Sequence, residues 1–83
     1  MESIIITVTN GEKTFCYDLD VPIEINCVDL KQDIIESING ANPMLMINPV
    51  SSHLFSKRLE REICDDETLV DAGVVNGDFL IIS

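Results

Sequence analysis

The chain has 83 residues, of which 46% are hydrophobic and 24% charged, and we expect residues 1–83 to form a single small globular domain. Fifteen acidic residues against five basic ones give a net charge of −10. This charge disfavours nucleic acid and anionic membranes, which both attract Lys and Arg, and it favours a protein partner with a basic surface.

The first predicted element is a β-hairpin. Residues 4–9 are β-branched and alternate between two faces, and Asn10-Gly11 is the strongest short signal for a hairpin turn. Apolar and polar residues then alternate up to Pro22. A turn of two or of four residues keeps Ile6 on the same face as Phe15 or Tyr17. The predicted buried face contains Ile4, Ile6, Val8, Phe15, Tyr17, Leu19 and Val21.

An amphipathic helix of about three turns is predicted next. Asn26 is a typical N-cap residue, and Asn39-Gly40 predicts a left-handed end to the helix. Between them, apolar residues recur at steps of three and four. They form one stripe, which consists of Cys27, Leu30, Ile34 and Ile38.

The remainder of the chain predicts short elements. Residues 41–52, which contain Pro43 and Pro49, are expected to be irregular, either as a buried loop or with an extra turn. Short strands are expected at 53–58 and 62–64, a helical turn at 69–74 closed by Gly73, and a last strand at 79–82. This order predicts an α+β protein with the β-grasp (ubiquitin-like) fold, in which one helix packs across one face of a mixed sheet of four to five strands.

The twenty residues from Ile63 to Ile82 carry a more specific pattern. The form L-x-D-x-G-[IV]-x-N-G-D-x-L-x-I is met by Leu69, Asp71, Gly73, Val74, Asn76, Gly77, Asp78, Leu80 and Ile82. This pattern resembles that of the YukD/EsaB family, small ubiquitin-like proteins that accompany Gram-positive type VII secretion systems. The resemblance covers the whole chain in element order, although residues 43–52 are long for the family.

The resemblance implies a cytoplasmic accessory or regulatory protein that is not conjugated to targets. Its partners would be membrane-embedded or cytosolic components of the secretion machinery, which would recruit it to the inner face of the membrane. Neither a signal peptide nor an inserted segment is expected, because residues 1–8 lack a basic flank and no apolar run reaches about 18 residues.

Two alternatives remain open. One is a ubiquitin-like modifier or sulfur carrier, which needs a slender C-terminal Gly-Gly, whereas this chain ends Leu80-Ile81-Ile82-Ser83. That function would require the native chain to continue beyond Ser83. The other is a ubiquitin-like adaptor of a different assembly.

The sequence offers few residues for catalysis, so we expect no enzyme activity, cofactor or metal. His53 is the only histidine and is expected at the surface. The acidic run 65–67 is expected to be solvated, and Asp71 to cap the helical turn or to accept backbone N–H bonds. Cys16, Cys27 and Cys64 are too few and too widely spaced for a disulfide framework. Cys27 is expected in the core, with a reactive thiol at the helix N-terminus as the alternative.

A partner-binding surface is expected on the sheet face opposite the helix. If Leu80 and Ile82 point inward, alternation sends their neighbours outward. The outward candidates are Ile5, Cys16, Phe55, Phe79 and Ile81. A partner protein or a second copy of the chain, as a homodimer, would cover them, and the alternative is coverage by residues 41–52.

The basic cluster Lys57, Arg58 and Arg61 has two interpretations. It either meets an acidic partner or offsets acids on neighbouring strands, and the second is favoured.

Overall fold

The computed structural model describes residues 2–12 and 14–83. They form five strands, two α-helices and one 3-10 turn. In chain order these are β1 (Ser3–Asn10), β2 (Cys16–Pro22), α1 (Cys27–Ala41), η1 (Pro43–Leu45), β3 (Leu54–Ser56), β4 (Arg61–Ile63), α2 (Leu69–Ala72) and β5 (Phe79–Ile82).

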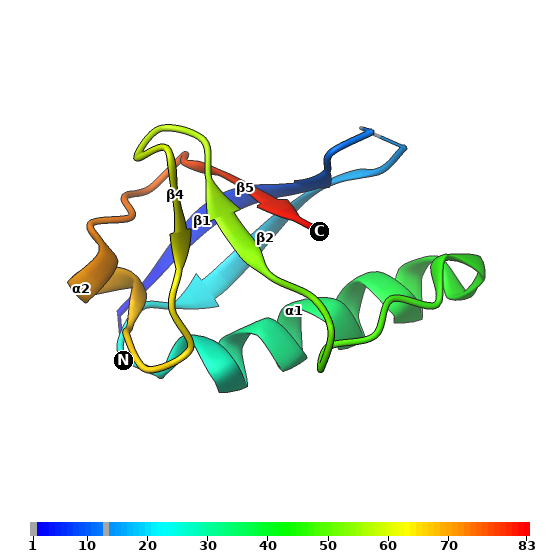
Figure 1. Ribbon diagram of the computed structural model, residues 1–83, viewed down its shortest axis with the longest axis horizontal. Coiled ribbons are helices and arrows are strands. Elements are labelled where there is room, and N and C mark those ends of the chain that lie inside the picture. Colours follow the sequence, from blue (N-terminus) through cyan, green and yellow to red (C-terminus); the bar gives the residue numbers. More distant parts are fainter. Residues whose placement is uncertain (1, 13) are drawn as a thin grey trace.

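The strands form one mixed sheet in the order β2-β1-β5-β3-β4. Strands β1 and β5 are parallel neighbours at its centre, and the other pairs are antiparallel. Helix α1 crosses one face of this sheet (Figure 1). This arrangement confirms the predicted α+β β-grasp fold. The hairpin register pairs Ile6 with Leu19 and Val8 with Tyr17, so the predicted shared face is also confirmed.

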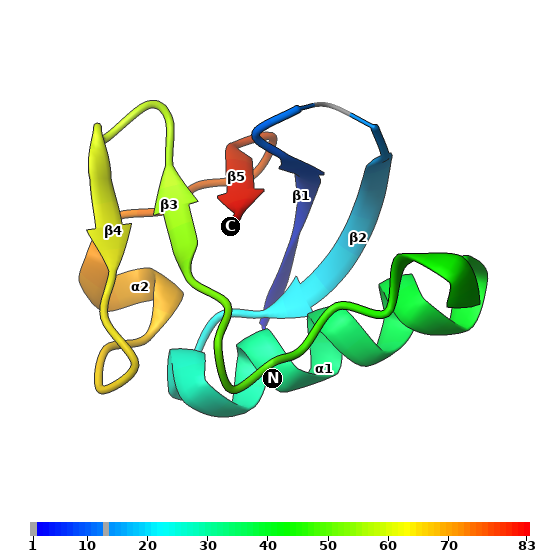
Figure 2. The same ribbon diagram turned by 45° about the vertical axis from the view of Figure 1, so that its right-hand side comes forward.

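The hydrophobic core fills the space between the sheet and α1. The inward side chains of β1 and β5, such as Ile6 and Leu80, are fully buried there. The predicted helical stripe is buried as well, and Ile35 joins it. Sheet and helix therefore cover each other's apolar sides. Within residues 2–12 and 14–83, no element covers the opposite face of the sheet (Figure 2).

Helix α1 differs from the prediction at both ends. It continues through Gly40 to Ala41, so the predicted left-handed stop at Asn39-Gly40 is wrong. The Asn39 side chain instead pairs with the backbone of Ile47, donating to its oxygen at 2.9 Å and accepting from its nitrogen at 3.0 Å. At the other end Asn26 is the N-cap residue as predicted, but its side chain makes no capping hydrogen bond.

The segment after α1 lies along the helix and not over the open sheet face (Figures 1 and 2). It contains the extra turn η1, and Leu45 and Ile47 pack partly against the core. Met44 and Met46 remain 88% and 82% exposed. The alternative that residues 41–52 cover the open face is therefore wrong.

The last third of the chain has the predicted elements with shorter or shifted bounds. Strand β3 occupies only the middle of the expected 53–58, and β4 begins one residue before the expected 62–64. Thr68 and Asp71 form a capping box around the start of α2, which confirms the capping role of Asp71. Gly73 then ends α2 with φ of +87°.

Candidate protein-interaction surface

The sheet face turned away from α1, called the open face here, displays alternate residues of β5. Leu80 and Ile82 are buried on the helix side, so Phe79 and Ile81 point to the open face. Phe79 is 45% exposed and Ile81 is half-buried. The predicted alternation along this strand is therefore correct.

Strand pairing brings three of the five candidate residues together. Phe55 of β3 lies directly opposite Ile81, and Phe79 is the next outward residue along β5. We call Phe55, Phe79 and Ile81 the open-face cluster. The central position of β5 explains the grouping, because residues paired across adjacent strands lie about 5 Å apart.

The other two candidates lie on the same face but outside the cluster. Cys16 pairs with Thr9, and Thr9 in turn pairs with Ile81, so a threonine separates the cysteine from the cluster. Ile5 is exposed and is paired with Asp20. It lies two residues along β1 from Thr7, the residue that is paired with Phe79. The role of all five residues in partner binding stays a prediction.

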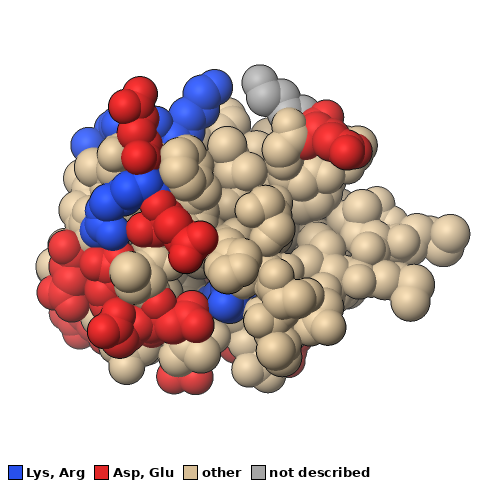
Figure 3. All heavy atoms as spheres, viewed as in Figure 1, with Lys and Arg blue, Asp and Glu red and all other residues tan. Residues whose placement is uncertain are grey.

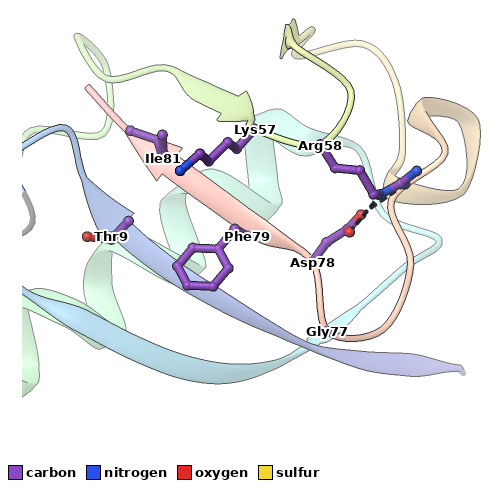
Figure 4. A pocket seen from close by; sticks show the side chains of 7 residues that line it. All are labelled: Thr9, Lys57, Arg58, Gly77, Asp78, Phe79 and Ile81. Atoms are coloured by element: carbon purple, nitrogen blue, oxygen red, sulfur yellow. Dashed lines mark hydrogen bonds and ion pairs between the residues drawn. The ribbon is translucent and has the colours of Figure 1, made fainter.

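A shallow groove of about 350 Å³ adjoins the cluster. In Figure 4, Thr9, Lys57, Phe79 and Ile81 are gathered at one end of it, and Arg58 and Asp78 lie at the other. Sequence reasoning missed the polar lining, although Lys57 continues the outward alternation that begins at Phe55. The groove is lined by Thr9, Lys57, Arg58, Gly77, Asp78, Phe79 and Ile81.

An ion pair fixes the turn that leads into β5. Arg58 donates from Nε to Asp78 Oδ1 at 2.8 Å and from a terminal nitrogen to Oδ2 at 3.0 Å, and it also donates to the carbonyl of Gly73. Asp78 accepts a further bond from the backbone of Val75. The Arg58 hydrogen bonds, followed by the Val75 N–H, hold the pKa of Asp78 below its usual value, although burial opposes this shift.

The basic cluster is largely engaged by acids of this chain. The two terminal nitrogens of Arg61 donate to the carboxylate oxygens of Glu67 at 2.8 and 3.2 Å, much as Arg58 donates to Asp78. For these two arginines the interpretation as partners of local acids is confirmed, although the acids lie in turns and not on strands. Lys57 differs from both arginines, because its ammonium group has no ion pair or hydrogen bond with the residues that the structure describes.

Glu67 contradicts the expectation that the acidic run is solvated. Its side chain is only 19% exposed and also accepts the N–H of Cys64 at 2.8 Å. The hydrogen bond from Arg61 and then the one from Cys64 lower its pKa. Asp65 and Asp66 are exposed as expected, and Asp65 pairs with Lys31 at 3.2 Å.

The cysteines and the histidine have structural or surface positions. Cys27 is 1% exposed, and burial, followed by the charges of Glu67 and Asp65, raises the pKa of its thiol to about 11. This confirms the core position and opposes a reactive thiol. His53 is exposed, with Nδ1 at 3.5 Å from Glu62 Oε1. Among the described residues, no group of His, Cys, Asp and Glu side chains could hold a metal ion.

Charge is distributed unevenly over the surface. Acidic side chains gather over α2 and the beginning of α1, on the left of Figure 3, whereas the end of α1 and η1 are uncharged in that view. The sequence explains the contrast, because residues 37–56 contain no Asp, Glu, Lys or Arg. No helix in the described part of the chain is long and apolar enough to cross a membrane.

Comparison with known proteins places this geometry in a family context. The family model described as "WXG100 protein secretion system (Wss), protein YukD" matches residues 3–82. None of the curated protein sequences matches the chain.

Solved structures with the same fold share little sequence with the chain. A ubiquitin-like domain from Arabidopsis thaliana has a TM-score of 0.77 at 15% identity, and the match covers 100% of this chain and 78% of the Arabidopsis chain. The ubiquitin of Caldiarchaeum subterraneum has a TM-score of 0.74 at 20% identity, with coverage of 98% and 91%. The ubiquitin-like domain of Plasmodium falciparum Dsk2 has a TM-score of 0.72 at 19% identity, with coverage of 99% and 100%. At these identities the likeness establishes the fold alone.

Proposed function

The chain belongs to the YukD family of the WXG100 protein secretion system, and from this membership we propose that it is a non-catalytic accessory of that system which binds a protein partner through its open-face cluster. In this proposal residues 1–83 act as one ubiquitin-like domain in the cytoplasm. The chain is not conjugated to targets, and contacts with secretion components bring it to the inner face of the membrane.

The observation that carries the proposal is the exposure of the open-face cluster. Phe79 is nearly half exposed beside Ile81 and Phe55, at the centre of a sheet face that no element in the described part of the chain covers. Contiguous apolar surface of this kind typically marks a contact site on a soluble domain, because leaving it in water costs free energy that a partner recovers.

The charge of the chain supports a foreign partner over a second copy. Two chains that each carry a net charge of −10 repel one another at low ionic strength, whereas a basic surface is attracted. The acid-rich end of the molecule would guide such a partner during approach, and the uncovered apolar residues would supply the contact.

The proposal is tested in the native host with Phe79→Asp in the chromosomal gene and Val28→Asp as the matched control. Val28 is 46% exposed on α1, almost the same fraction as Phe79, but on the opposite side of the molecule. Both variants add one negative charge in place of an exposed apolar side chain. The measurement is the amount of WXG100 protein in the culture medium relative to the cells, with circular dichroism of each purified variant to establish folding.

We expect Phe79→Asp to change export while the folded Val28→Asp variant exports like the wild type. Equal export by both folded variants would show that the open face does not serve secretion, and the proposed binding face would then be wrong.

A further inference from the structure

The groove beside the open-face cluster combines an apolar wall with one cation. The wall is made by Phe79 and Ile81, and Lys57 reaches over it from the end of β3 (Figure 4). A groove of about 350 Å³ is large enough for one or two side chains of a bound segment. Its chemistry therefore indicates which side chains the segment carries.

The other polar side chains of the groove are already engaged within the chain. Asp78 accepts hydrogen bonds from Nε and from one terminal nitrogen of Arg58, so these two charges neutralise each other. Thr9 donates its hydroxyl to the carbonyl of Phe15 at 2.7 Å. Among the described residues, the ammonium of Lys57 is the one charged group of the lining without a partner.

Apart from Asp78, the acids of the open face in the described part of the chain lie on its edge strands and do not line the groove. Asp18, on the edge strand β2, accepts the Thr7 hydroxyl at 2.7 Å. Glu62, on the edge strand β4, is paired with Phe55, and its carboxylate lies 3.5 Å from His53 Nδ1. Asp20 is opposite Ile5, at the far end of β1 from Ile81. Among the described residues that line the groove, Lys57 is therefore the one charge that is not neutralised, although the whole chain is strongly acidic.

We infer that the groove binds a segment of a partner protein in which an Asp or Glu side chain adjoins an apolar one. The apolar side chain covers Phe79 and Ile81, and the carboxylate accepts a charge-assisted hydrogen bond from Lys57. Lys57 is then the residue that determines specificity, because a basic or neutral side chain in the same position would leave its ammonium unpaired against the partner.

This inference rests on the proposed use of the open face, and it refines the expected partner. The basic surface expected from the net charge would lie opposite the acids on the edge strands of the open face, Asp18, Asp20 and Glu62, and opposite the acid-rich end of the molecule. The segment that enters the groove carries the opposite charge. The requirement for both a basic surface and an acidic segment distinguishes the correct partner from a protein that has only a basic surface.

The test is selection from a random-peptide library displayed on phage, at physiological salt, with four purified proteins as targets. These are the wild type, Lys57→Glu, Phe79→Asp, and a control with Gln32→Glu and Ser51→Glu. The control changes the net charge by −2, as Lys57→Glu does, but at exposed positions on α1 and in the loop along it. The peptide most enriched by the wild type is then synthesised and its affinity measured for all four proteins.

We expect the wild type to enrich peptides in which Asp or Glu adjoins a large apolar residue. Lys57→Glu should weaken the synthesised peptide about tenfold and should shift its own selected pool toward Lys and Arg, whereas the double control should do neither. Phe79→Asp should lose the peptide altogether.

Two kinds of result would overturn the inference. If the selected peptides have no acidic bias, or bind Lys57→Glu as well as the wild type, Lys57 does not select a carboxylate, while sensitivity to Phe79→Asp would still support the open face. If no peptide is enriched, or if Phe79→Asp binds normally, the open face itself is not the binding surface and both proposals are wrong.

Discussion

Asp78 is the charged residue that stabilises the turn before β5. Its side chain is 6% exposed and connects Arg58 to the turn at Val75. Its backbone oxygen accepts the N–H of Thr7 at 2.9 Å, which joins the same turn to β1. The position of the open-face cluster thus depends on a charge at the start of the strand that carries it.

We expect Asp78→Asn to lower the free energy of unfolding at pH 7 by about 1–3 kcal/mol, because the guanidinium of Arg58 loses its charged acceptor. The pKa of Asp78 is lowered in the folded state, so its contribution is present above the ordinary carboxyl pKa and is lost as pH falls through the lower folded value. Urea denaturation between pH 7 and pH 2 should show this acid-side loss in the wild type and a smaller one in Asp78→Asn. Asp66→Asn, in an exposed turn, should match the wild type, and a wild-type profile for Asp78→Asn would contradict this role.

Cys27 leads to a second prediction at the residue scale. Its thiol pKa is raised from 9.0 to about 11, so the folded state keeps the proton longer than the unfolded chain does. The stability this thiol provides is complete below about pH 9 and declines as pH rises toward 11. With a thiol reagent under native conditions, exposed Cys16 and Cys64 should react quickly and Cys27 only after unfolding. Rapid reaction of all three thiols would contradict the buried position.

At the scale of elements, α1 covers the sheet through its apolar stripe. Ile34 is buried in this stripe, whereas Val28 on the same helix is exposed. We expect Ile34→Ala to lower the free energy of unfolding by about 2–5 kcal/mol, because it removes core contacts and leaves a cavity. Val28→Ala should change it by less than about 0.5 kcal/mol. Urea denaturation of the two variants provides the comparison, and equal midpoints would show that α1 does not pack as described.

The end of α1 gives a prediction with the opposite sign. Gly40 lies inside the helix, and a Cβ added there would meet no atom within 4 Å. Gly40→Ala should therefore raise the free energy of unfolding by about 0.5–1 kcal/mol, because alanine restricts the unfolded chain and favours helix. Gly73 has φ of +87°, so Gly73→Ala should destabilise the protein. If Gly40→Ala were destabilising in thermal denaturation, the helix would end before this residue.

These elements also show what local sequence could predict. Strand β5 has the predicted bounds, because alternation and the Asn76-Gly77-Asp78 turn agree there. Helix α1 continues past the predicted stop at Asn39-Gly40 because Asn39 pairs with Ile47, a contact eight residues away that overrides the local preference of Asn-Gly. Strand β3 is shorter than predicted, since its length depends on partners β4 and β5, which local sequence does not specify.

At the scale of the whole molecule, the sequence order alone predicted the β-grasp fold, because one helix and a few strands have few ways to cover each other. The outward residues of β5 followed from alternation alone. Their grouping with Phe55, and the separation of Cys16 and Ile5 from them, required the sheet order and register. The engagement of Arg58 and Arg61, which leaves Lys57 as the free cation of the described groove, also arises from tertiary contacts.

The central claim is that the open face contacts a component of the secretion machinery. The most direct measurement is photo-crosslinking in the native host, with a benzoyl-phenylalanine residue in place of Phe79 or, as the control, of Val28. We predict that the Phe79 position forms an adduct in which mass spectrometry identifies a component of the WXG100 secretion machinery, and that the Val28 position does not. An adduct with that machinery from Val28 alone, or only a second copy of the chain crosslinked at Phe79, would contradict the account.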